Sequence, residues 1–119
     1  MASTPEGVVK KKVREILDRY PRMHYDMPVP MGFGRATLDF TGCYNGRYFA
    51  IETKAEGKKP TLRQDQTIAK MRDAGAAVFV ISGTVDLAYA DLIGWLEHNR
   101  PTSHDDAYLP QEKGRHRPL

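Results

Sequence analysis

The sequence predicts an α/β fold in which helices flank a central mixed sheet, and three observations support this class. The dipeptide Asn45-Gly46, a strong signal for a two-residue hairpin turn, separates two β-rich runs, 37–44 and 47–54. Patterns typical of amphipathic helices precede and follow this hairpin. The continuous apolar run 77–81 then indicates a buried strand after the second helix. The predicted order is α-β-β-β-α-β-α.

The first helix is expected to run from the cap residue Thr4 to about Tyr20, with Pro5 at its first position. Its apolar residues fall on one stripe: Val9, Val13, Ile16, Leu17 and Tyr20. The next segment, 23–29, is interpreted as an edge strand, because the prolines at positions 28 and 30 would interrupt a central ladder. A flexible connection, 31–35, leads into the hairpin.

The second helix is predicted from the cap residue Thr61 to Ala74, with Gly75 as its stop signal. A last helix is predicted over about 86–98, where apolar residues line one side. The remaining segment, 100–119, is polar and interrupted by prolines, which is typical of a loosely ordered tail.

Length and composition limit the class of protein. A chain of 119 residues fits one compact domain, which we place at 1–99, followed by the tail at 100–119. No apolar run is long enough to span a bilayer, and we find no secretory signal, so we expect a cytoplasmic protein without membrane contact. The single cysteine cannot form an internal disulfide, and no Cys/His pairs have zinc spacing. We expect no organic cofactor.

The hairpin register brings two carboxylates together. If Asn45 and Gly46 form the turn, each pair of opposed residues has numbers that sum to 91, and Asp39 falls opposite Glu52. Like charges at such a pair are destabilising unless something compensates. Mg²⁺ does so, because it takes oxygen ligands and is often held by one or two carboxylates. The backbone carbonyl of Thr53 is a candidate for a further ligand.

Lys54 lies two residues beyond Glu52 and therefore projects to the same face of the strand. Its ammonium group could orient an attacking water or neutralise charge that develops on a phosphate, while a bound metal ion lowers the pKa of the water. The arrangement indicates a hydrolytic centre. The alternative is a surface salt-bridged patch, and an inserted residue in either strand would move Asp39 off the shared face.

Together these residues resemble a known family. The set is similar to the motifs of the PD-(D/E)xK nuclease superfamily. It consists of Asp39, then Glu52-Thr53-Lys54, then Thr61-x-x-Gln64, and an Ala-Gly-Ala segment before an apolar strand. More narrowly, it resembles the virus-type replication-repair (VRR-NUC) nucleases of phages, over about residues 5–83. One departure is Leu38, which stands where the family commonly has proline.

The resemblance implies a restriction-endonuclease-like core and assigns roles. It makes Asp39 and Glu52 metal ligands, Lys54 the residue that assists attack, and Gln64 part of the same centre. Gln64 also completes a capping box with Thr61, and the two roles are compatible.

Two assignments keep an alternative. Gln66 replaces Gln64 if the helix begins later. Relatives carry a further carboxylate on the first helix, for which Glu6 and Glu15 compete; Glu6 is favoured because it shares a helical face with the apolar stripe. A plain structural role for Glu6, as a charge that complements the helix N-terminus, is the alternative.

Basic residues flank the proposed centre in sequence. The formal net charge is +3, and Arg35, Lys58, Lys59 and Arg63 are candidates for holding DNA phosphates without reading sequence. Solubility is the alternative role for these charges.

The leading hypothesis is a Mg²⁺-dependent endonuclease that hydrolyses DNA phosphodiester bonds, with Mn²⁺ able to substitute. The resemblance implies branched DNA such as Holliday junctions as substrate, a homodimer that makes paired cuts, and, for a phage-encoded protein, the bacterial host cytoplasm. A non-catalytic nucleic-acid-binding module with the same fold is the alternative, and a structural subunit that needs no metal is a third.

Overall fold

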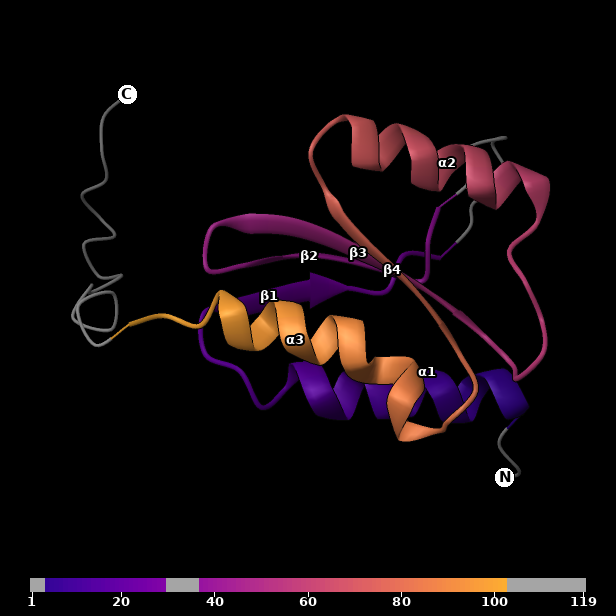
Figure 1. Ribbon diagram of the computed structural model, residues 1–119, viewed down its shortest axis with the longest axis horizontal. Coiled ribbons are helices and arrows are strands. Elements are labelled where there is room, and N and C mark those ends of the chain that lie inside the picture. Colours follow the sequence, from indigo (N-terminus) through magenta and orange to yellow (C-terminus); the bar gives the residue numbers. More distant parts are fainter. Residues whose placement is uncertain (1–3, 30–36, 103–119) are drawn as a thin grey trace.

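The computed structural model describes residues 4–29 and 37–102, and within them the chain folds as a mixed sheet between two helical layers (Figure 1). Its elements follow one another as α1 (Pro5–Leu17), β1 (Met23–Asp26), β2 (Phe40–Tyr44), β3 (Arg47–Lys54), α2 (Leu62–Asp73), β4 (Ala77–Ser82), a 3₁₀ helix η1 (Asp86–Tyr89) and α3 (Ala90–His98). The predicted fold class and element order are confirmed. Within these ranges, no helix is both long and apolar enough to cross a bilayer.

The sheet has the strand order β1-β2-β3-β4, with antiparallel pairing up to β3 and parallel pairing of β3 with β4. Asn45 and Gly46 both have positive φ, at 47° and 83°, as a tight hairpin turn requires. Tyr44 pairs with Arg47, and the register continues without a bulge to the pair of Phe40 with Ile51. The predicted register is therefore confirmed along β2.

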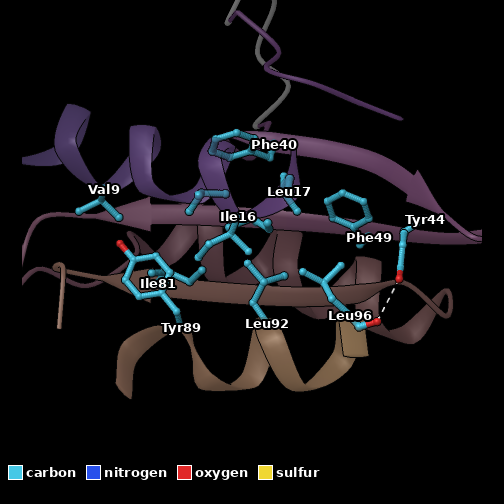
Figure 2. Close-up of a cluster of buried hydrophobic side chains, with 12 residues drawn as sticks. Val9, Ile16, Leu17, Phe40, Tyr44, Phe49, Ile81, Tyr89, Leu92 and Leu96 are labelled. Atoms are coloured by element: carbon cyan, nitrogen blue, oxygen red, sulfur yellow. Dashed lines mark hydrogen bonds between the residues drawn. The ribbon is translucent and has the colours of Figure 1, made fainter. Parts of the chain in front are cut away.

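Two apolar clusters hold the layers together. The larger lies between the sheet and helices α1 and α3 (Figure 2). Of the stripe predicted for the first helix, Tyr20 is partly buried against this cluster, and the other four residues are buried in it. Within it the Tyr44 hydroxyl donates to the Leu96 carbonyl oxygen at 3.1 Å, which ties the hairpin to α3. The smaller cluster lies under α2, on the opposite face of the sheet, and consists of Leu38, Ala50, Ile68 and Val78. Strand β3 contributes Phe49 and Ile51 to the larger cluster and Ala50 to the smaller one, so helices cover both of its faces.

Two predicted elements end early. The first helix ends at Leu17 rather than at about Tyr20, because the next amides bond three residues back, from Arg19 to Ile16 and from Tyr20 to Leu17. The first strand ends at Asp26 rather than at 29. Its predicted edge position is confirmed, and the early end is consistent with Pro28, which has no amide hydrogen to donate.

Two further predictions need correction. The second strand begins at Phe40 and not at 37, because the chain bends at Asp39. The last predicted helix is split into η1 and α3. Val85 at its N-cap has no side-chain oxygen to accept from the first amides, and the tighter bond from Ala88 to Val85 satisfies one of them.

Candidate active site

Glu52 is the most deeply buried charged residue of the proposed centre. Glu52 lies near the C-terminal end of β3, and its side chain is 2% exposed. One carboxylate oxygen, Oε2, accepts from Gln64 Nε2 at 2.7 Å and lies 3.3 Å from Lys54 Nζ. The other oxygen, Oε1, is buried and has no hydrogen-bond partner among the described residues. A buried carboxylate oxygen without a partner is costly, so this atom is available for a ligand.

Gln64 performs two tasks with one amide group. Its Oε1 accepts from the backbone amide of Thr61 at 2.9 Å. In return, the Thr61 hydroxyl accepts from the backbone amide of Gln64 at 3.1 Å, which completes the predicted capping box of α2. Its Nε2 donates to Glu52. The cap thus fixes the end of the side chain that holds Glu52. Gln66 is exposed, so the structure places Gln64 and not Gln66 at the centre.

Asp39 occupies the bend one residue before β2, one step beyond the last pair of the hairpin ladder. Its Oδ2 accepts from both the amide and the hydroxyl of Thr53, at 2.8 and 2.7 Å. These two bonds fix the carboxylate beside the strand residue that follows Glu52. The predicted strand pair with Glu52 is not formed. Asp39 instead bonds to Thr53, whose side chain projects to the face of β3 opposite to that of Glu52 and Lys54, so these bonds do not confirm the predicted shared face. Whether the Thr53 carbonyl binds metal stays a prediction.

The two carboxylates are electrostatically coupled. Burial, and after it the negative charge of Asp39, raise the pKa of Glu52 from 4.5 to about 7, against the lowering effect of Lys54. Glu52 therefore changes protonation near neutral pH. A cation that neutralised both carboxylates would offset the repulsion between them and the free-energy cost of burying the Glu52 charge.

Lys10, on α1, was not among the predicted site residues. Its Nζ lies 3.6 Å from Asp39 Oδ1 and 3.7 Å from Glu6 Oε2. Glu6 is thus linked to the centre through Lys10, while its competitor Glu15 is exposed. The signal in the sequence was the spacing of four residues between Glu6 and Lys10, which places both on one helical face.

The predicted phosphate-binding residues that the structure describes are exposed, unlike this buried network. Lys58 and Lys59 are exposed in the connection from β3 to α2, and Arg63 is exposed in the first turn of α2. Arg35 lies outside the described residues. The three described side chains are therefore close in sequence to Lys54 and Gln64 and open to solvent.

The donor set fits a hard divalent cation better than a transition-metal cluster. Within residues 4–29 and 37–102, no group of three or more His, Cys, Asp or Glu side chains is arranged to hold a metal ion. Two carboxylates, one with an orphaned oxygen, suit Mg²⁺, which keeps several waters and takes few protein ligands. Asp39 and Glu52 are the residues that would hold it.

Comparisons with known proteins add an independent finding. No protein-family model matches the chain, and the curated proteins contain no match to it. A solved structure described as a VRR_NUC domain is similar to it, with a TM-score of 0.64 and 26% sequence identity, over 77% of this chain and 97% of that one. From this similarity and the mixed sheet described above, the chain has the fold of a VRR_NUC domain, a nuclease-type domain.

Proposed function

We propose that this protein is a Mg²⁺-dependent endonuclease that hydrolyses phosphodiester bonds of DNA. The observation that carries the proposal is the orphaned, buried Oε1 of Glu52 next to the charge of Asp39. A protein gains no stability from such a pair, whereas a cation-dependent nuclease needs one. The similarity to a VRR_NUC domain supports the same reaction class.

Each side chain has a role in this proposal. Asp39 and Glu52 would hold the cation, which when bound polarises the phosphate and lowers the pKa of water. Gln64 holds Glu52 Oε2 so that Oε1 stays free. Lys54, whose Nζ lies 3.3 Å from Glu52 Oε2 and whose side chain is 15% exposed, would stabilise charge on the phosphate.

The substrate and assembly follow from the resemblance and the charge distribution. Lys58, Lys59 and Arg63 are exposed and close in sequence to Lys54 and Gln64, which supports a DNA substrate read by its backbone. We propose branched DNA such as Holliday junctions as the preferred form. One domain with one centre makes paired cuts as a homodimer, and we place this activity in the cytoplasm.

The proposal is tested by cleavage assays on supercoiled, linear, single-stranded and four-way-junction DNA, with Mg²⁺, with Mn²⁺ and with a chelator. We expect cleavage with either metal and none with the chelator. Glu52→Gln should abolish cleavage and keep DNA binding, while the control Glu56→Gln, an exposed carboxylate in the connection after β3, should leave both unchanged.

The same assays separate the alternatives. DNA binding without cleavage on every substrate would support the non-catalytic binding module and overturn the proposal. Glu6→Gln and Glu15→Gln, compared in one series, test the helical carboxylate, and we expect a loss of activity from the first variant only. Sedimentation with and without junction DNA tests the homodimer.

A further inference from the structure

Lys10 lies near the Asp39 oxygen that Thr53 does not contact. Asp39 Oδ2 is already occupied by two bonds from Thr53. The remaining oxygen, Oδ1, has the Lys10 ammonium 3.6 Å away. A cation that binds both carboxylates must therefore approach Asp39 where Lys10 now neutralises it.

The contact between Lys10 and Asp39 differs from the contact between Lys54 and Glu52. Lys54 lies 3.3 Å from an oxygen that Gln64 also holds, and it leaves Glu52 Oε1 without a partner. The distance from Lys10 Nζ to Asp39 Oδ1 is longer, at 3.6 Å. The Lys10 side chain is 32% exposed, more than twice the exposure of Lys54. A partly solvated ion pair of this length is weak and can separate at little cost.

Glu6 provides a second partner for the ammonium. Its Oε2 lies 3.7 Å from Lys10 Nζ, one helical turn before it on α1. When Lys10 leaves Asp39, it can therefore stay paired with Glu6. The exchange does not require the ammonium to become unpaired.

We propose that Lys10 is an exchangeable counter-ion: it neutralises Asp39 in the metal-free protein, competes with the divalent cation for Oδ1, and is retained by Glu6 after displacement. This inference rests on the proposed metal site and adds a regulation to it. Competition by Lys10 lowers the affinity of the site for the cation, so that half-filling of the centre needs a higher concentration of the metal.

The test is isothermal titration calorimetry of the full chain with Mn²⁺, without DNA, at pH 8. Lys10→Met keeps the aliphatic stem and removes the charge, and we expect it to bind Mn²⁺ roughly threefold to tenfold more tightly than wild type. The matched control is Lys11→Met, which removes the same charge from an exposed neighbour on α1 and should change the affinity less than about twofold. Unchanged or weaker binding by Lys10→Met overturns the inference.

Glu6→Gln sharpens the test. In the wild-type background it should weaken Mn²⁺ binding, because Lys10 loses its second partner, and in the Lys10→Met background it should have no effect. An equal loss in both backgrounds would make Glu6 a ligand and contradict its role as the partner of Lys10. Thermal unfolding of each variant checks folding, and Lys10→Gln replaces Lys10→Met if the latter does not fold.

Failure of this inference is distinguishable from failure of the proposed function. If wild type binds Mn²⁺, Asp39→Asn abolishes binding and Lys10→Met matches wild type, the metal site stands and the role of Lys10 is wrong. If wild type and both variants bind no Mn²⁺, the metal site and the role of Lys10 are both wrong.

Discussion

The strand β3 contains two consecutive triplets that are almost equally buried and have opposite chemistry. Phe49-Ala50-Ile51 is fully buried among apolar side chains from α1, α2 and α3. In Glu52-Thr53-Lys54 the first two residues are as inaccessible, at 1% and 0%, yet their partners are Asp39, Gln64 and a lysine. The first triplet stabilises the fold, whereas the second carries a desolvated carboxylate that works against it. This difference marks the second triplet as the functional part of the strand.

The largest expected effect is on catalysis and falls on the second triplet. Glu52→Gln and Asp39→Asn should each reduce the cleavage rate at least about a thousandfold, because each removes a proposed metal ligand. The measurement is single-turnover cleavage of the preferred DNA substrate with saturating Mg²⁺. Retention of more than a tenth of the wild-type rate by either variant contradicts the assignment.

The first triplet should show the opposite profile. Phe49→Ala leaves a cavity in the larger apolar cluster and should lower the free energy of unfolding by about 3 to 5 kcal/mol. Urea denaturation measures this loss. The comparison fails if Glu52→Gln destabilises the metal-free protein as much as Phe49→Ala does.

Glu52 should make the metal-free protein less stable as the pH rises. Because the pKa of this acid is about 7 in the folded state and 4.5 as its ordinary value, the folded state binds more protons between these values. The stabilisation is complete below pH 4.5 and lost as the pH rises through 7, an effect of about 3 kcal/mol. Urea denaturation in chelator at pH 5, 6, 7 and 8 measures it. A Glu52→Gln variant that keeps the same slope assigns the effect to another group.

The smallest effect concerns the residue that joins α2 to the second triplet. Gln64→Ala should lower stability by about 1 kcal/mol, because it removes half of the capping box and one hydrogen bond to Glu52. The matched control is Gln66→Ala, which changes an exposed glutamine of the same helix and should stay within about 0.5 kcal/mol of wild type. Equal losses in thermal unfolding would remove the distinction between the two glutamines.

Much of this arrangement follows from local patterns in the sequence. The Asn45-Gly46 turn fixes the register of the hairpin, and alternation along β3 separates the faces of its residues. The box formed by Thr61 and Gln64 is equally local, because both partners lie in one turn of helix. These features need no knowledge of the rest of the chain.

The end of β2 and the position of Lys10 could not be predicted in the same way. Leu38 and Phe40 have the same parity in a continuous strand, yet Leu38 packs under α2 and Phe40 packs toward α1. The bend at Asp39 results from this division between two apolar clusters, and it turns a predicted strand pair into a side-chain contact with Thr53. Lys10 reaches Asp39 because α1 packs on the sheet, which is a tertiary contact.

The central claim is that Asp39 and Glu52 coordinate the same cation, and a crystal structure of the protein with Mn²⁺ tests it most directly. Anomalous difference density locates the ion without assumptions about the protein. The account predicts one peak within about 2.3 Å of both Asp39 Oδ1 and Glu52 Oε1, with Lys10 moved away from Asp39. A peak that contacts neither carboxylate, or only one of them, would contradict it.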